Sequence, residues 1–416
     1  MAIRPQQRLI VATPHVPDAV APPPGNPRFP LVDGLRAAAA LGVLIGHVAS
    51  VTGAATVTTA GDIGVDLQMG VTVFFVISGF LLYRPFVAAD LGDRASPSPM
   101  RFYRRRILRI IPAYWLALTL FALLIPIDQV MSEDWWKYYL LIQNFWGFDS
   151  AIVPGMGQAW TLSVEASFYL LLPLYALAMR VVGGRSPRRR LWTDLTVLLA
   201  LGGASAYLRW QMVANAFPNG PRTPAIQFLF DLLPGQGLSL TLPTYFAWFA
   251  IGMAFAVISS WSYATNGTTK VVDAISKHSN ILWLCAGAAF LALLVGTPLL
   301  SKGESPEHHL LTGLVAAFFV APAAFPNTSK RGLPTRILSL GWVAWLGLIS
   351  YGIYLWHNGL LDLMMQHDAI PTWKPYMSGT IMLLAITMPV SAVSYYLIEK
   401  PFLKLKEPRN SRKNLP

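Results

Sequence analysis

Charged side chains are scarce in this sequence. Asp, Glu, Lys and Arg make up 12% of the 416 residues, whereas hydrophobic residues make up 54%, and the mean hydropathy is +0.47. This composition excludes an ordinary soluble domain and predicts a protein with many membrane-spanning segments. The chain has a single cysteine, Cys285, so an intramolecular disulfide is excluded. Because Cys285 lies in an apolar run, we expect it to be a packing residue.

Three further features are missing from the sequence. No apolar stretch of signal-peptide length lies in residues 1–28, which are rich in proline and alanine and are expected to form a disordered cytoplasmic tail. No internal repeat is visible, which disfavours a transporter built from repeats. No long polar region interrupts or follows the apolar segments, so no separate soluble domain is expected, and residues 404–416 are expected to form a short basic cytoplasmic tail.

The sequence does contain a series of long apolar segments. A helix needs about 20 such residues to cross a hydrocarbon core of about 30 Å. We therefore predict an all-α polytopic membrane protein with about ten transmembrane helices. The expected segments lie near residues 34–54, 67–89, 107–125, 161–182, 191–213, 242–261, 280–299, 310–326, 338–363 and 376–398.

The basic residues predict the orientation of these helices. Of the 32 Lys and Arg residues, all but five lie in one set of alternate loops or beside it, and cytoplasmic loops carry such an excess. Both termini are therefore predicted to be cytoplasmic. The same loop pattern accounts for the net charge of +12, so no nucleic-acid partner is expected. The five exceptions are Lys137, Arg209, Arg222, Lys302 and Lys374.

Two ionisable residues occur in the first predicted helix. Arg36 and His47 are eleven residues apart in largely apolar sequence, which is about 16 Å along a helix and close to three full turns. They therefore share one face, with Arg36 at the cytoplasmic edge and His47 near the midplane. Ionisable groups inside a bilayer are functional candidates. The alternative is an orientation-setting arginine and a histidine that only hydrogen-bonds within the bundle.

Further candidates lie in the second and third predicted helices. Arg106 and Arg109 are one helical turn apart at the cytoplasmic edge, and planar guanidinium groups suit a phosphate ligand. Contact with anionic lipids is the alternative. Ser78 is predicted to lie about 16 Å deep, beside the level of His47. There it either contacts a substrate or, with Gly79, merely permits close helix packing.

Three residues point to the outer half of the membrane. Glu165 is predicted about 7 Å below the outer edge of the fourth helix, where it either orients a histidine or acceptor or serves as a structural partner. Trp160 precedes it toward the outside. His357 is predicted at the outer end of the ninth helix, as a functional residue or as an interfacial histidine beside an aromatic belt. No metal site is predicted.

Several motifs resemble the membrane acyltransferase-3 family, and they occur in the family's order across about residues 29–403. The members are integral-membrane enzymes that O-acylate sugars, peptidoglycan, glycolipids or macrolides, which implies a multi-pass protein of the bacterial inner membrane. Some members add a C-terminal SGNH-hydrolase-like domain, which is not expected here. The motifs are Leu31–Arg36 with His47, Phe74–Phe80, Arg106-x-x-Arg109, Trp160–Tyr169 and Tyr396–Phe402.

The resemblance and the residue pattern together predict a mechanism. Cytosolic acyl-CoA, expected to be acetyl-CoA, is the donor, and His47 is the general base that activates a hydroxyl of a carbohydrate, glycolipid or macrolide acceptor. Direct transfer is favoured over an acyl-Ser78 intermediate, because the sequence shows no base beside Ser78. No permanently bound cofactor is expected. The remaining assignments are Arg36, Arg106, Arg109 and Ser78 for acyl-CoA binding, Glu165 for orienting the histidine or acceptor, and Trp160 and His357 for the acceptor side.

Two other classes of function fit the same candidate residues, which are predicted to extend from the cytoplasmic edge to the outer half of the membrane. A transporter or lipid translocator would conduct a solute along these residues. A catalytically silent scaffold or receptor would neither conduct a solute nor transfer an acyl group. Thioester hydrolysis or acyl transfer by the purified protein separates the enzyme from both.

Overall fold

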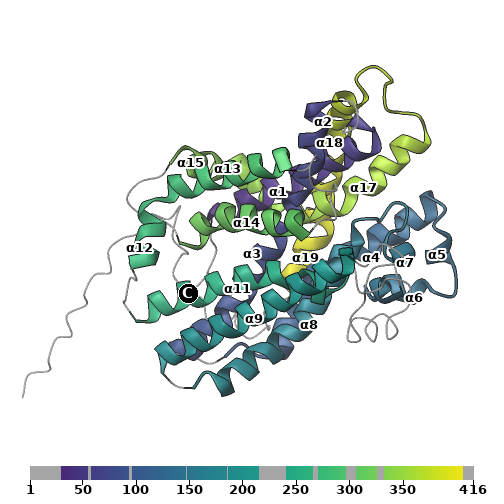
Figure 1. Cartoon of the computed structure of the whole chain (residues 1–416). Coiled ribbons are helices and arrows are strands. Elements are labelled where there is room, and N and C mark those ends of the chain that lie inside the picture. Colours follow the sequence, from purple (N-terminus) through teal and green to yellow (C-terminus); the bar gives the residue numbers. More distant parts are fainter. Residues whose placement is uncertain are drawn as a thin grey trace, which may run out of the picture.

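The computed structural model describes residues 30–54, 58–92, 96–146, 148–184, 186–214, 240–265, 270–296, 306–325 and 332–405. Within these ranges every regular element is helical (Figure 1). Short 3-10 or π-helical turns carry the label η. The elements are α1 Pro30–Val51, α2 Thr59–Asp66, η2 Leu67–Met69, α3 Gly70–Leu91, α4 Pro99–Leu124, α5 Asp128–Met131, α6 Trp135–Tyr139, η3 Gln143–Trp146, α7 Phe148–Ala151, α8 Ala159–Val182, α9 Pro187–Ala214, α11 Leu242–Ala264, α12 Lys270–Lys277, α13 Ser279–Gly296, α14 Pro306–Ala324, α15 Leu333–Leu338, α16 Gly341–Leu348, α17 Ser350–Gln366, α18 Pro375–Ser394, η4 Tyr395–Glu399 and α19 Lys400–Lys404.

Nine helical spans in the described residues are long and apolar enough to cross a membrane, and each coincides with a predicted segment. The remaining predicted segment, the ninth at 338–363, is split at Ile349 into α16 and α17. The second span begins at Thr59, where α2 leads through η2 into α3, and not near residue 67 as predicted. The prediction of an all-α polytopic membrane protein is confirmed. The cytoplasmic location of the termini stays a prediction.

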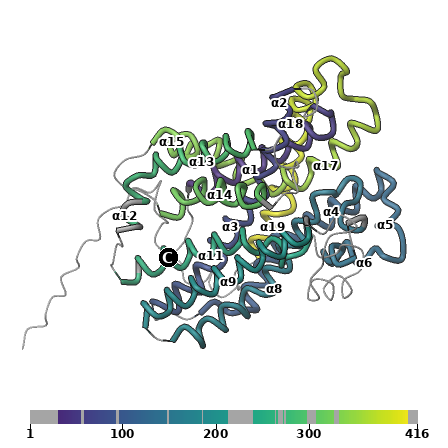
Figure 2. The backbone as a smooth tube through the Cα atoms, in the orientation of Figure 1, coloured from purple at the N-terminus to yellow at the C-terminus, as the bar shows by residue number. Residues whose placement is uncertain are grey.

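The centre of the bundle is organised around α1 and α3. In Figure 2 the purple tube of α1 passes beside α3 and α14, and α3 also packs against α8 and α11. Two glycines let α3 and α11 approach closely. A Cβ on Gly79 would overlap the Phe249 carbonyl oxygen, and a Cβ on Gly252 would overlap the Val76 carbonyl oxygen. Small residues at such crossings give helices in membranes their packing contact.

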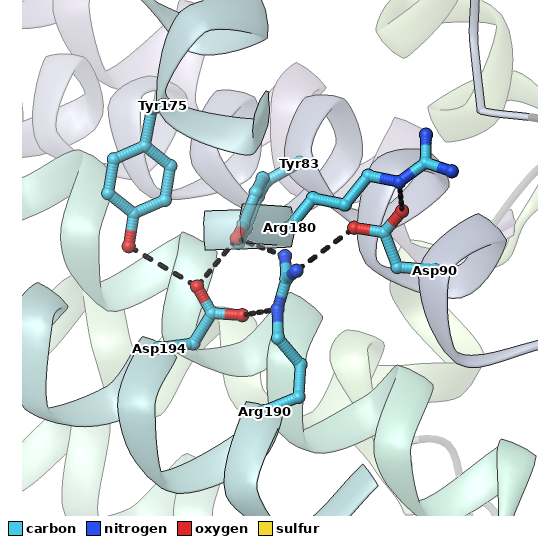
Figure 3. A network of polar contacts seen from close by, with 6 residues as sticks. All are labelled: Tyr83, Asp90, Tyr175, Arg180, Arg190 and Asp194. Atoms are coloured by element: carbon cyan, nitrogen blue, oxygen red, sulfur yellow. Dashed lines mark hydrogen bonds and ion pairs between the residues drawn. The ribbon is translucent and has the colours of Figure 1, made fainter. Parts of the chain in front are cut away.

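A network of charged and phenolic side chains joins α3, α8 and α9 (Figure 3). The Arg190 guanidinium lies 3.0 Å from an Asp90 carboxylate oxygen and 2.6 Å from an Asp194 oxygen. The Tyr83 hydroxyl donates to the other Asp194 oxygen at 2.7 Å. Since Arg190 and Asp194 are buried, this pairing is what makes their charges tolerable, and the network fixes the three helices relative to one another. Arg180 and Tyr175 complete it.

Two long connections between predicted helices, residues 126–160 and 214–241, are described in part. Residues 126–160 contain the short helices α5, α6 and α7 and the turn η3, with Trp135, Trp136 and Trp146 exposed. Exposed tryptophans of this kind suit a membrane interface. Residues 1–28, 406–416 and most of 214–241 lie outside the described residues.

Candidate functional site

The three predicted donor arginines line one cavity of about 220 Å³, which we call the arginine cavity. Arg36 comes from α1, and Arg106 and Arg109 come from α4. Arg106 Nε is buried and has no hydrogen-bond partner among the described residues. Three guanidinium groups from two helices, one of them with a buried N–H donor that has no partner among the described residues, form a site suited to an anion.

Glu165 of α8 lies in the wall of the arginine cavity. The Ser78 hydroxyl donates to Glu165 Oε1 at 2.9 Å, and the Tyr169 hydroxyl donates to Glu165 Oε2 at 2.7 Å. The carbon at the centre of the Arg106 guanidinium lies 5.8 Å from the centre of the Tyr169 ring. Glu165 therefore partly balances the arginines, which resembles the alternative of a structural partner more than the predicted contact with a histidine.

Ser78 lines the arginine cavity and does not line the cavity that contains His47. The predicted level beside His47 counted residues from Leu67, whereas the span begins at Thr59, so Ser78 lies farther along it. The sequence-based statement that no base adjoins Ser78 is also corrected, because a Glu165 oxygen accepts its hydrogen bond.

A second cavity, of about 320 Å³, contains His47, and we call it the histidine cavity. Trp160 lines it, and its assignment to the acceptor side stays a prediction. Val71 and Tyr354 line both cavities, so these two side chains form part of the wall between them. An anion site and a titratable histidine are therefore separated by one layer of side chains.

His47 is hydrogen-bonded to His357. The distance from His47 Nδ1 to His357 Nε2 is 2.9 Å, and His357 Nδ1 lies 3.0 Å from the Ile353 carbonyl oxygen. A carbonyl oxygen only accepts, so His357 Nδ1 must carry a proton; in a neutral His357, Nε2 is then an acceptor. It follows that His47 Nδ1 donates and that His47 Nε2 keeps its lone pair, which is the state a general base requires.

The predicted place of His357 at the outer end of the ninth helix is wrong. Because the predicted helix is interrupted at Ile349, His357 falls in the middle of α17, where it is completely buried. The side chain that contacts His47 is thus His357, whereas the sequence-based prediction gave Glu165 the task of orienting the histidine or the acceptor.

Several lining residues were not predicted. Tyr169 lies inside the Trp160–Tyr169 motif, and Tyr354 lies in the predicted helix that contains His357. Each is about one turn from a candidate residue, Glu165 or His357, and this spacing was a usable signal. Arg209, His309 and Gln158 also line the histidine cavity, but they come from separate parts of the chain, and no local pattern marks them. In the described part of the chain, no group of His, Cys, Asp and Glu has the arrangement of a metal site.

Comparison with known proteins finds several bacterial acyltransferases that are similar to this chain. Peptidoglycan O-acetyltransferase OatA of Listeria monocytogenes is 24% identical over 90% of this chain and 56% of its own length. The putative peptidoglycan O-acetyltransferase YrhL of Bacillus subtilis is 25% identical over 90% of this chain and 54% of its own. Acyltransferase MdmB of Streptomyces mycarofaciens is 26% identical over 92% of this chain and 94% of its own length.

The chain thus spans little more than half the length of the two peptidoglycan O-acetyltransferases. No solved structure is significantly similar to it. A family model described as an acyltransferase domain matches residues 29–396. The chain therefore belongs to the membrane acyltransferase-3 family.

Proposed function

We propose that the protein is a multi-pass O-acyltransferase of the bacterial inner membrane, which moves an acyl group from acyl-CoA to a hydroxyl of a carbohydrate, glycolipid or related acceptor. The observation that carries the proposal is the pair of cavities that share Val71 and Tyr354 in their walls, with three arginines in one and His47 in the other. The curated relatives are O-acetyltransferases and an acyltransferase, which supports the same reaction class and favours acetyl-CoA as donor.

The arginine cavity is the proposed donor site. Arg36, Arg106 and Arg109 bind the phosphates of the CoA moiety, for which guanidinium groups supply planar pairs of donors. The Tyr169 ring, whose hydroxyl donates to Glu165, lies beside the Arg106 guanidinium in the cavity wall. The slender pantetheine arm then passes between Val71 and Tyr354 and presents the thioester to His47.

His47 is the proposed general base. Its Nε2 accepts the proton of the acceptor hydroxyl as that oxygen attacks the thioester carbonyl carbon. The carbon–sulfur bond breaks, the new ester leaves with the acceptor, and the proton on His47 passes to the departing CoA thiolate. His357 keeps the imidazole in the required tautomer through the 2.9 Å hydrogen bond and stabilises the imidazolium that forms.

An acyl-Ser78 intermediate is the competing route for the same reaction, since Glu165 stands beside the Ser78 hydroxyl as a base. Direct transfer is favoured because Ser78 does not line the histidine cavity, where the proposed acceptor binds. A transporter or a silent scaffold remains the competing class of function, and neither would release CoA.

The test uses full-length protein in lipid nanodiscs with radiolabelled acetyl-CoA and a glycoside acceptor. We expect acetyl transfer and CoA thiol release by the wild type, with both lost in His47→Ala that still binds CoA. Binding of acetyl-CoA without transfer or hydrolysis, over a panel of sugar, glycolipid and macrolide acceptors, would favour the scaffold. Movement of a solute or lipid across the bilayer without CoA release would favour the transporter.

A further inference from the structure

The arginine cavity and the histidine cavity share a part of their walls that comes from α3 and α17. Val71 of α3 and Tyr354 of α17 line both cavities. Phe74 of α3 and Thr161 of α8 line the arginine cavity and contact Tyr354. We call these four residues the neck. An acyl-CoA whose phosphates bind the arginines would reach the histidine cavity by passing its acyl end through the neck first.

The Tyr354 side chain is held in place at its hydroxyl and at its ring. The hydroxyl oxygen lies 2.6 Å from the Thr161 hydroxyl oxygen and 3.3 Å from the Gln158 carbonyl oxygen. The ring meets the Phe74 ring edge to face, with 5.7 Å between the ring centres, and the centre of the His357 ring lies 5.8 Å away. Only 6% of Tyr354 is exposed. The ring cannot swing aside without losing these buried hydrogen bonds and ring contacts.

Val71 also limits how far the neck can widen. A valine side chain branches at Cβ and has one strongly preferred rotamer in a helix. Val71 lies in the first turn of α3, one turn before Phe74 on the same face. The neck is therefore bounded by side chains that have little freedom, unlike a passage lined by flexible methionines. We expect the width of an acyl group, and not its length, to decide whether it passes.

Acyl groups differ in width through branching. A linear acyl chain is a row of methylene groups and is no wider than the end of the pantetheine arm, which has to fit the neck in any case. A methyl branch on the carbon beside the carbonyl makes the leading end of the donor wider. Because stiff, well-packed side chains resist one additional methyl group, the branch should slow passage about tenfold.

We propose that the neck formed by Val71, Phe74, Thr161 and Tyr354 determines acyl specificity by shape, so that it admits linear acyl groups and retards those branched beside the carbonyl. The inference rests on the proposed function, in that the donor enters from the arginine cavity. A neck raises the barrier for entry and for exit by the same amount, so it changes both rates and leaves the affinity unchanged. A pocket that merely fits one acyl group better would change the affinity instead.

The experiment compares two isomeric ligands, the butyryl and isobutyryl ketone analogues of acyl-CoA. In these analogues a methylene group replaces the thioester sulfur, so that neither transfer nor hydrolysis occurs, and the two acyl groups differ only in branching. Each radiolabelled analogue is bound to the full-length protein in nanodiscs without an acceptor, and its dissociation is followed after addition of excess CoA. The equilibrium affinity is measured on the same samples.

From the wild type, we expect the isobutyryl analogue to dissociate about tenfold more slowly than the butyryl analogue, with affinities that agree within about threefold. Val71→Ala widens the neck, and Tyr354→Phe removes the hydroxyl that holds the ring, so in each variant the two rates should agree within about threefold. The control is Val65→Ala, which removes the same two methyl groups from the wall of the histidine cavity outside the neck and should keep the tenfold difference. Binding of 3′-phospho-ADP, the part of CoA that precedes the pantetheine arm, checks that each variant is folded.

Equal dissociation of the two analogues from the wild type would overturn the proposal, as would a tenfold difference that persists in both neck variants. A weaker affinity for the isobutyryl analogue that arises from faster dissociation would also overturn it. If the neck variants change the rates as expected but acetyl-CoA and butyryl-CoA give no transfer, the neck stands and the proposed function fails. If transfer occurs and branching leaves the dissociation rate unchanged, the proposed function stands and the neck fails. If neither analogue nor 3′-phospho-ADP binds, both fail.

Discussion

Replacing His357 probes how the proposed base is oriented. His357→Leu fills a similar space but removes the acceptor of the hydrogen bond from His47 Nδ1, which spans 2.9 Å. His357→Gln returns a side-chain oxygen that can accept the same proton. We expect acyl transfer to fall in the leucine variant and to recover in part in the glutamine variant.

The magnitude follows from the charge that develops on His47. In the resting enzyme the hydrogen bond joins two neutral rings, but in the transition state His47 is an imidazolium, and a hydrogen bond to a charged group contributes about 1.5–3 kcal/mol. The neutral hydrogen bond of the resting state contributes about 1 kcal/mol, so the transition state loses about 0.5–2 kcal/mol more than the resting state does. At about 1.4 kcal/mol per factor of ten, His357→Leu should lower kcat by about 2- to 30-fold. The KM for acyl-CoA should stay near the wild-type value, since His357 does not line the arginine cavity.

The assay is steady-state CoA thiol release with a saturating glycoside acceptor, on nanodisc protein that passes gel filtration. Acetyl-CoA binding to each variant controls for folding. A leucine variant with wild-type kcat would refute the role assigned to the hydrogen bond between His357 and His47. A leucine variant in which kcat and acetyl-CoA affinity fall together, with no recovery in His357→Gln, would show that His357 serves packing alone.

Three more results are expected. Reporter fusions near residue 187 should report the cytoplasm and fusions near residue 145 the outside, because of the basic-residue bias; an outside signal at 187 would reverse the donor side. Arg36→Ala, Arg106→Ala and Arg109→Ala should each weaken CoA binding by about 1.5–3 kcal/mol, the scale of a charge-assisted contact, and unchanged affinity in all three stable variants would favour an anionic-lipid role. Ser78→Ala should keep most of the transfer activity; trapping of an acyl group on Ser78 by mass spectrometry would contradict direct transfer.

The sequence predicted those features that depend on position along one helix. The apolar segments predicted nearly all of the membrane-spanning helices. The predicted position of Arg36 and Arg106 at the same membrane edge also agrees with their lining one cavity, although they belong to different helices. His47 was recognisable because an ionisable residue in a long apolar run is costly. These inferences need only the rise of a helix and the membrane thickness.

Errors arose wherever a helix departed from a single straight segment. The early start of the second span at Thr59 displaced Ser78, and the break at Ile349 displaced His357. Depth counted along an isolated helix also does not show which neighbour a side chain faces. Glu165 was expected to orient the histidine or the acceptor, whereas it accepts hydrogen bonds from Ser78 and Tyr169. The ring contacts in the wall of the histidine cavity, between Trp160 and Tyr245 and between Trp248 and His309, depend on how α8, α11 and α14 are arranged in space. No local sequence pattern encodes that arrangement.

The central claim is that His47 performs the proton transfer of acyl transfer and does not serve donor binding. Its most direct test is single-turnover acetyl transfer from radiolabelled acetyl-CoA by wild type and His47→Ala in nanodiscs, with CoA affinity measured on the same samples. The account predicts near-normal CoA binding and a transfer rate at least about 100-fold lower in His47→Ala. Transfer by His47→Ala at the wild-type rate would contradict it.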